Sequence, residues 1–213
     1  GLLPGTGRNG ALVSRQALLT PYPQFTGITT STNDGKSWYN ALNLEVQKRF
    51  SRGYTFQAAY TWSKYIVANS LLNAGDAMPE RVISPQDYPH NLTLTWVYEF
   101  PLGRGRKLLN QNHRVVDSLV GGWQLSGIYS AQSGEALGFG DAILYGSIKD
   151  IALPESQRTP ERWFNTEIFE RRPAFQLASH LRTMPSRFSG IRSDGTNYWD
   201  VSLMKNTNIT EKV

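Results

Sequence analysis

Cysteine is missing from this 213-residue chain, and its absence excludes a disulfide framework, a thiolate nucleophile and a cysteine-based zinc site. Long apolar runs are missing too, because no stretch approaches the roughly 18 apolar residues of a membrane helix. The start of the sequence at Gly1 shows no charged-then-apolar signal segment, so we expect a processed chain or a piece of a longer one. A helical membrane protein is therefore excluded, whereas a β-barrel stays open because half of each barrel strand is polar.

A concentrated basic patch is also missing, although the formal net charge is +5 and the pI about 9.5. Such a balance can indicate a nucleic-acid partner. The basic residues are scattered, apart from the run Arg104-Gly105-Arg106-Lys107, and no recognised binding motif accompanies them. We therefore expect no nucleic-acid partner.

Aromatic residues, in contrast, are abundant: six Trp, ten Tyr and nine Phe. Many fall where apolar and polar residues alternate, as they do in a strand whose side chains point to opposite sides. In the clearest segment, 37–50, one side carries the apolar residues Trp38, Leu42, Leu44, Val46 and Phe50. Its length suits a tilted bilayer crossing, which takes roughly 9–11 residues.

The same alternation predicts further strands. Together with the first, they lie near 37–50, 54–64, 91–100, 122–135 and 198–209. Ser51-Arg52-Gly53 joins the first two as a hairpin, because glycine can adopt the positive φ of a tight turn.

The predicted strands divide the chain into two parts. Residues 1–36, rich in Gly, Pro and Thr, form an irregular entry segment, and 37–213 form the strand-bearing part. Within that part, proline- and glycine-containing stretches predict long loops at 65–90 and 136–197.

The connections after the first and third predicted strands are shorter than those after the second and fourth. Outer-membrane barrels show this asymmetry, with short periplasmic turns and long extracellular loops. If the 51–53 turn is periplasmic, aromatics of the apolar side gather at both ends. The extracellular group is Trp38, Trp62 and Trp199, and the periplasmic group is Phe50, Tyr54, Tyr98, Phe100 and Trp123. Two such girdles are typical of a membrane barrel.

The predicted fold is all-β, an antiparallel transmembrane β-barrel segment with long extracellular loops. Five strands do not close a barrel, whose smallest examples have about eight, and open edges in lipid leave backbone groups unpaired. We therefore expect a larger barrel. A soluble β-sandwich alternates in the same way and remains an alternative. Asn40, Lys48, Lys64 and Lys205 on the proposed lipid face count against the barrel, unless the lysines reach head groups from the strand ends.

Several stretches resemble the barrel of TonB-dependent outer-membrane receptors, closest to the large Oar-like group with an N-terminal carboxypeptidase-regulatory-like domain. They are PYPQF (21–25), 37–64, 84–109, GGWQLSGIYSAQSGEAL (121–137), WFNTEIF (163–169) and 197–213. The resemblance implies a late, C-terminal part of a roughly 22-stranded barrel. It also implies the expected partners: outer-membrane lipid, the rest of the barrel and its plug domain, TonB through an N-terminal region not in this sequence, and an unknown small ligand.

Two enzyme-like motifs fail on context. Gly5-Thr6-Gly7-Arg8-Asn9-Gly10 fits the dinucleotide pattern G-x-G-x-x-G, but no strand precedes it. Ser202 and Lys205 fit S-x-x-K, yet strand residues three apart point to opposite faces. We expect no catalytic residue and no cofactor, and hence no enzyme.

The histidines predict no metal site, because His90, His113 and His180 lack metal-ligand spacing. Asp87 and His90 flank Pro89 closely enough to touch. Their expected role is local, in starting the third strand.

The polar side of the strands predicts a lumen that holds a plug or lines a path, with simple solvation as the alternative. Its residues include Glu45, Arg49, Gln57, Glu99, Gln124 and Asp200. The expected function is ligand uptake through the bacterial outer membrane as part of a TonB-dependent receptor, and no ligand-binding residue is assigned. The alternatives are a structural or adhesive barrel acting as an anchor or subunit and, more weakly, a soluble carbohydrate-binding sandwich.

Overall fold

The structure is a computed structural model. It describes residues 8–13, 15–19, 22, 25, 28–103, 105–109, 114–176 and 180–207. The chain divides into two units, residues 1–34 and 35–213, and each is described by itself. The first contains the short helix α1 (Arg15–Leu19). The predicted irregular entry segment therefore contains a short helix. The Arg8 guanidinium donates a hydrogen bond to the Ala17 carbonyl of this helix over 2.6 Å.

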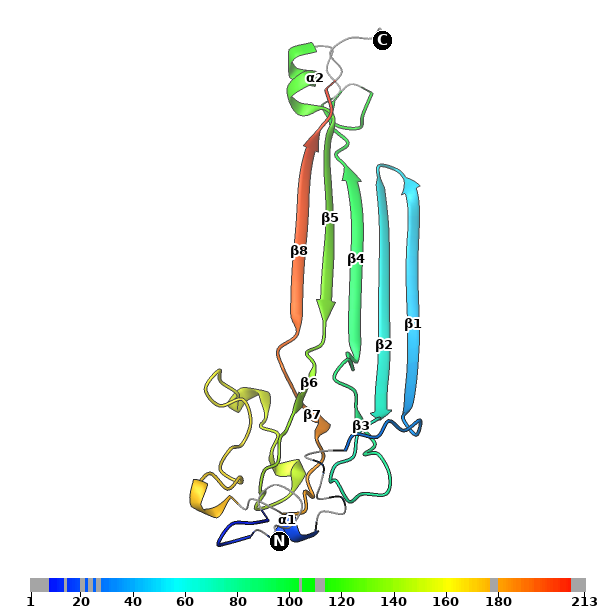
Figure 1. Ribbon diagram of the computed structural model, residues 1–213. Helices are drawn as coiled ribbons and strands as arrows, with labels where there is room; N and C mark the ends of the chain where they lie inside the picture. The colour runs from blue at the N-terminus through cyan, green and yellow to red at the C-terminus, as the bar shows by residue number, and fades with distance from the viewer. Residues whose placement is uncertain are drawn as a thin grey trace. The chain divides into compact units, whose positions relative to one another are not determined.

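The second unit is built on one antiparallel sheet in the order β1-β2-β4-β5-β8 (Figure 1). These strands are β1 (Lys36–Ser51), β2 (Tyr54–Ala68), β4 (His90–Glu99), β5 (Trp123–Gln132) and β8 (Thr196–Lys205). A two-residue strand, β3 (Val82–Ile83), adds to β2. Within the described residues β1 and β8 each pair on one side only, so the sheet is open at both edges.

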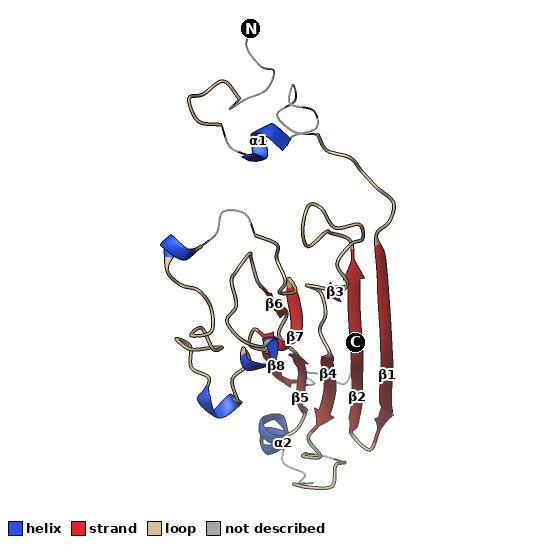
Figure 2. Cartoon of the chain, turned by 90° about the horizontal axis from the view of Figure 1, so that it is seen from below, coloured by secondary structure: helices blue, strands red, loops and turns tan. Residues whose placement is uncertain are grey.

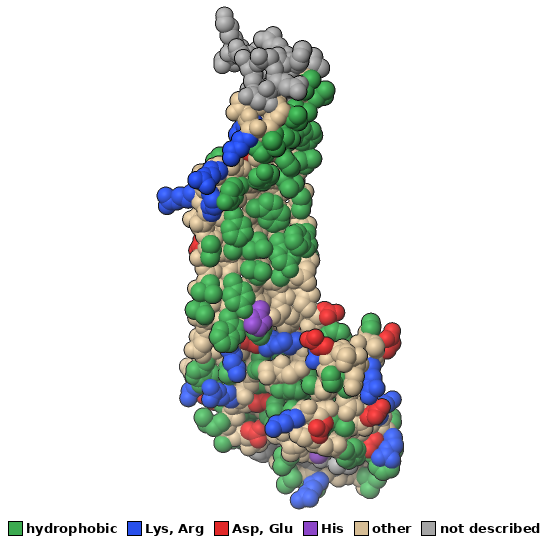
Figure 3. Space-filling model, turned by 180° about the vertical axis from the view of Figure 1, so that it is seen from behind, with side chains coloured by type: hydrophobic (Ala, Val, Ile, Leu, Met, Phe, Trp, Pro, Cys, Tyr) green, Lys and Arg blue, Asp and Glu red, His purple; other side chains and the backbone are tan. Residues whose placement is uncertain are grey.

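The pairing register keeps the predicted apolar residues on one face. Leu44 lies opposite Tyr60, and Tyr60 lies opposite Leu92 on the next strand. Because a slip of one residue would turn a whole strand over, the alternating pattern specifies this register. Apolar side chains gather over the strands on the face seen in Figure 3, whereas most charged side chains gather over the loops.

No second sheet covers this apolar face in the part of the chain that the structure describes. Leu44, at the middle of β1, is 52% exposed, and the other sheet contains only β6 (Ala136–Gly138) and β7 (Arg187–Arg192). A sandwich would bury Leu44 between two sheets. The sandwich alternative is therefore wrong, because the apolar face has no packing partner within this unit.

Strand ends differ from prediction. β2 runs on to Ala68 rather than ending at 64, because its last residues pair with the start of β1 and with β3. β5 ends at Gln132 rather than 135, and β8 is Thr196–Lys205 rather than 198–209. The last pair there is Gln132 with Thr196. Ile209, predicted on the last strand, lies outside the described residues.

The predicted asymmetry of the connections is partly wrong. β1 and β2 are joined by the tight turn Arg52-Gly53, whose φ angles of 56° and 87° are both positive. The connection after β4, however, spans 100–122 and is as long as the one after β2, because it contains helix α2 (Arg114–Val120). Only the 133–195 connection is much longer than the others. We call the end of the sheet with the 52–53 turn the turn-bearing end, and the opposite one the loop-bearing end.

Two of the lysines that counted against a lipid face lie at the turn-bearing end, where they have partners. Lys48 Nζ is 2.5 Å from Ser51 Oγ and 4.1 Å from the centroid of the Tyr54 ring. Lys205 donates to the carbonyls of Leu119 (3.1 Å) and Gly121 (2.8 Å), at the C-terminus of α2. A cation there complements the negative end of the helix dipole.

Gly127 is required where β5 passes under an aromatic side chain. A Cβ at this position would overlap Cζ2 of the Trp96 indole and lie 2.9 Å from the Asp200 carbonyl oxygen. We expect Gly127→Ala to lower the free energy of unfolding by about 1–3 kcal/mol, the usual cost of overpacking. Urea unfolding of the full-length protein in lipid vesicles would measure it. Gly140→Ala is the matched control, since nothing lies within 4 Å of its Cβ. Equal stability of the two variants would contradict the prediction.

Candidate functional site in the loop cap

The two long connections at the loop-bearing end form what we call the loop cap, residues 69–89 and 133–195. Figure 1 shows it beyond one end of the long strands, with α2 at the other end, and Figure 2 shows that it consists mostly of loops and turns with short helices and strands. Besides β3, β6 and β7, it contains the 3-10 helices η1 (Ile148–Asp150), η2 (Glu155–Gln157) and η3 (Pro173–Phe175).

The larger loop has a hydrophobic core of its own. Ile151, Met184 and Ile191 are buried there, and several partly buried side chains pack against them. Among these, the rings of Phe139 and Phe188 stack with centroids 5.2 Å apart. The prediction of an irregular loop over 136–197 is therefore corrected. Turns, 3-10 helices and the short strands β6 and β7 build this core, and none of them is long enough for periodicity to reveal it.

The WFNTEIF stretch is part of that core. The Trp163 indole N–H donates to the Arg192 carbonyl over 2.6 Å, and Phe164 packs edge-on against Phe169 at 6.1 Å. Its aromatic residues therefore hold the 133–195 loop together.

Side chains of the smaller loop bind the larger loop. The Glu80 carboxylate accepts hydrogen bonds from the Ser186 backbone N–H (2.8 Å) and hydroxyl (2.6 Å). The Asn73 amide donates to the Arg182 carbonyl (3.1 Å) and accepts from its N–H (2.8 Å). These residues are more than a hundred positions apart in the chain.

A buried ion pair forms the third link. Asp87, 1% exposed, accepts from the Arg192 guanidinium over 2.5 Å and from the Tyr65 backbone N–H over 2.5 Å. Arg192 also donates to the carbonyls of Asp87 (2.7 Å) and Gly134 (3.1 Å). The pair thus joins the end of β2 to both loops. No hydrogen bond or ion pair joins Asp87 to His90; they bind Arg192 and Tyr60 instead.

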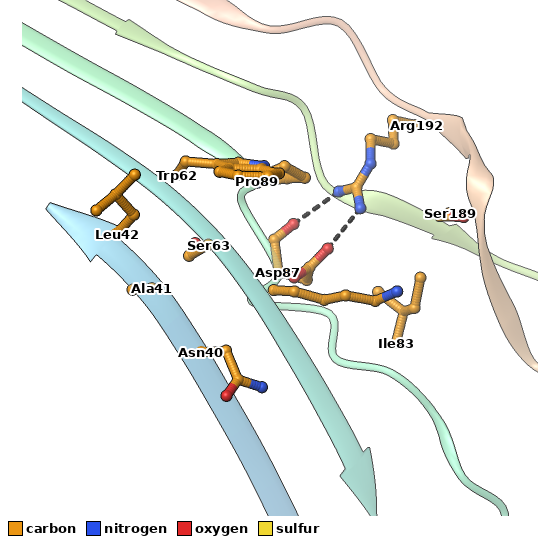
Figure 4. Close-up of a pocket in the computed structure, with 11 residues that line it drawn as sticks. Asn40, Ala41, Leu42, Trp62, Ser63, Ile83, Asp87, Pro89, Ser189 and Arg192 are labelled. Carbon is orange, nitrogen blue, oxygen red and sulfur yellow. Dashed lines mark hydrogen bonds and ion pairs between the residues drawn. The ribbon is translucent and has the colours of Figure 1, made fainter.

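A cavity of about 400 Å³ lies beside this ion pair (Figure 4). Its lining is mostly apolar and includes Leu42, Trp62 and Ile83, and the Asp87–Arg192 pair adds a charged part to it. Lys64 and Asn40, neighbours across β1 and β2, complete the wall contributed by the sheet. Such a cavity can hold an apolar group next to a polar one.

A second buried carboxylate orders the outer part of the cap. Glu170, 6% exposed, accepts from the Arg172 guanidinium over 2.7 Å and from the Tyr145 hydroxyl over 2.7 Å. These hydrogen bonds, first those from Arg172, hold the pKa of Glu170 well below its usual range. The same carboxylate raises the pKa of Tyr145.

Acid should therefore loosen this part of the cap. A lowered pKa means that Glu170 stabilises the fold fully above the ordinary carboxyl pKa near 4.5, and progressively less as the pH falls below it. We expect amide hydrogen exchange around 143–145 and 168–172 to accelerate as the pH is lowered from 6 to 3, after correction for the intrinsic rate. Glu170→Gln should weaken protection at pH 6 and flatten that response. An unchanged pH response in this variant would contradict the assignment.

The predicted lumen residues share one face, except that Arg49 lies where the β1 register shifts. Three of them, Glu45, Gln57 and Glu99, have side-chain partners. Gln57 donates to Glu45 over 2.9 Å, and Arg106 pairs with Glu99 over 3.1 Å. Asp200 lines a hollow of about 540 Å³ on this face with Gln57. The structure brings Gln124 opposite Glu99.

The histidines are dispersed. His90 shares a 2.7 Å hydrogen bond with the Tyr60 hydroxyl, His180 lies 3.0 Å from Asp141, and His113 falls outside the described residues. Among the described residues, no three metal-ligating side chains gather. In the same residues, every helix is too short or too polar to span a membrane. Of the G-x-G-x-x-G stretch, Gly5 and Gly7 lie outside the described residues.

Comparison with known proteins places this geometry in a family. A family model described as "Outer membrane beta barrel domain" matches residues 3–213. Searches of curated proteins and of solved structures find no match. The matched region contains the whole open sheet with its apolar face, as expected for a segment of a barrel in lipid. The chain therefore belongs to the outer membrane β-barrel domain family, and its location is the bacterial outer membrane.

Proposed function

We propose that this chain is a late part of the barrel of a TonB-dependent receptor that takes up a small ligand, with the loop cap facing outward. The observation that supports this most is the joining of two distant loops into one cap by Glu80, Asn73 and the Asp87–Arg192 pair. Loops held in place before binding lose little conformational entropy when a ligand arrives. A cap of this kind suits capture of a scarce solute.

The open edges of β1 and β8 support the remaining parts of the proposal. Among the described residues, each edge leaves a row of backbone groups unpaired, which lipid does not satisfy. Further strands of the same barrel would pair there, and the polar face, with Glu45 and Asp200, would then enclose a lumen wide enough for a plug. No enzymatic step, metal or cofactor belongs to this proposal.

Binding to TonB tests the proposal. The full-length protein in detergent should be retained by the immobilised periplasmic domain of TonB, and a full-length variant without its segment nearest the mature N-terminus should not. If the folded full-length protein were retained no more than the truncated variant, uptake driven by TonB would be contradicted.

A structural or adhesive role is the second candidate, and the surface of the cap favours it. Large apolar side chains are exposed there, including Leu71, Met78, Tyr145, Phe175 and Leu181. Exposed apolar groups of this size often mark contacts with other proteins. This role predicts no binding to TonB. It also predicts that a photoreactive amino acid placed at position 145 or 181 forms cross-links to one neighbouring outer-membrane protein in intact cells.

A further inference from the structure

Charged residues on the apolar face lie near both ends of the sheet, but the two ends use them differently. At the turn-bearing end, Lys48 and Lys205 bind oxygens of their own chain. At the loop-bearing end, Lys36 and Lys64 form no hydrogen bond or ion pair with any residue that the structure describes. Their charges are therefore available to a ligand.

A third cation joins them. Arg81 lies over the Trp38 ring, with Cζ 4.7 Å from the ring centroid, and its guanidinium likewise has no hydrogen-bond partner among the described residues. Trp38 pairs with Ile66, directly beside the pair formed by Asn40 and Lys64. We call Lys36, Lys64 and Arg81 the rim cluster.

Among the described residues, no carboxylate forms an ion pair with the rim cluster. Glu80, the residue before Arg81, accepts both of its hydrogen bonds from Ser186. Asp87 is buried in its pair with Arg192. Glu80 keeps its own charge, because Ser186 is a neutral donor, but one carboxylate does not cancel three cations, so the cluster carries net positive charge on the face that meets lipid.

The surroundings of the cluster match the boundary between lipid chains and head groups. Trp38 and Trp62 flank Lys64 on the same face, and tryptophan in barrels is enriched at that boundary. Towards the middle of the sheet, Leu42 and Leu44 follow and are exposed. The cavity of about 400 Å³ opens between Leu42, Trp62 and Lys64.

We propose that the rim cluster binds the phosphate of a phosphorylated membrane lipid, whose acyl chain lies along Leu42 and Trp62. The apolar face receives the chain, and the three cations receive the phosphate oxygens by charge-assisted hydrogen bonds. That this lipid belongs to the outer leaflet, where phosphorylated glycolipids such as lipid A reside, rests on the orientation given under the proposed function.

Native mass spectrometry of the full-length protein in neutral detergent tests the site, with lipid A as the probe. Lys64→Gln/Arg81→Gln should reduce the lipid-bound fraction at limiting lipid A by roughly tenfold or more, because each cation contributes to attraction of an anionic lipid. Lys149→Gln/Arg171→Gln is the matched control, since it removes the same charge from exposed parts of the cap and should leave binding unchanged. Faster migration of unheated protein in gel electrophoresis verifies that each variant is folded.

Two further probes identify what is recognised. Lipid A stripped of its phosphates should bind the wild type as weakly as lipid A binds the double variant. Inorganic phosphate alone should not compete at millimolar concentration, because it lacks the acyl chain. Equal binding of lipid A by wild type and double variant, equal binding of the stripped lipid, or full competition by inorganic phosphate would each overturn the proposal. None of these measurements involves TonB, so the two proposals fail independently.

Discussion

Arg192→Leu is expected to lower the free energy of unfolding of the loop cap by about 3–5 kcal/mol, the usual cost of leaving one partner of a buried ion pair alone. Asp87 would keep a buried carboxylate with the Tyr65 N–H as its remaining donor. The 133–195 loop would also lose its attachment to the end of β2. Cleavage of the cap by proteinase K in intact cells should then accelerate at least roughly 100-fold, provided that opening is fast relative to cleavage.

Arg162→Leu is the control for this prediction. Its partner Glu167 is 3.9 Å away and both side chains are more than half exposed, so its pair should contribute under about 1 kcal/mol. Adding Asp87→Asn to Arg192→Leu should recover part of the loss, because no charge is then left buried. If Arg192→Leu were cleaved no faster than Arg162→Leu, the buried pair would not hold the cap.

Leu44→Arg should be the most damaging single change on the sheet. Leu44 lies at the middle of β1, on the apolar face and exposed, so in a barrel it meets the hydrocarbon near the bilayer midplane. Arginine at that depth costs about 2–4 kcal/mol. Denaturant unfolding of the full-length protein in lipid vesicles, followed by tryptophan fluorescence, would measure the loss.

Gln47→Arg places the same charge three residues further along β1, on the opposite, polar face. Its side chain lines the hollow with Gln57 and Ser202, which water fills in an open lumen. We expect a change of under about 1 kcal/mol for this variant. Should Gln47→Arg prove as damaging as Leu44→Arg, the assignment of the two faces would be wrong.

The sheet is the part of this protein that local pattern predicts well. The alternation from Trp38 to Val46 and from Tyr54 to Trp62 predicts both the strands and the face of each side chain, because the period of a strand is set by its backbone. The alternation predicts the end of a strand less well than its middle. β2 continues to Ala68 because β1 and β3 supply partners there, and partners are not a property of the segment itself.

The loop cap is the part that local pattern missed. Its core residues Ile151, Met184 and Ile191 have no regular spacing. In the sequence, Asp87 and Glu80 do not differ from other acidic residues of loops. Only the position of Arg192 and Ser186 beside them gives these carboxylates their structural role.

By itself, the sequence determined an open sheet with one apolar and one polar face, since alternation within each strand specifies both. Tertiary structure alone decided that the two long loops fold into one cap and that Arg81 lies over Trp38, near Lys36 and Lys64, with no ion pair among the described residues. Those features depend on contacts between residues as far as 109 positions apart, and no local spacing encodes a contact of that range.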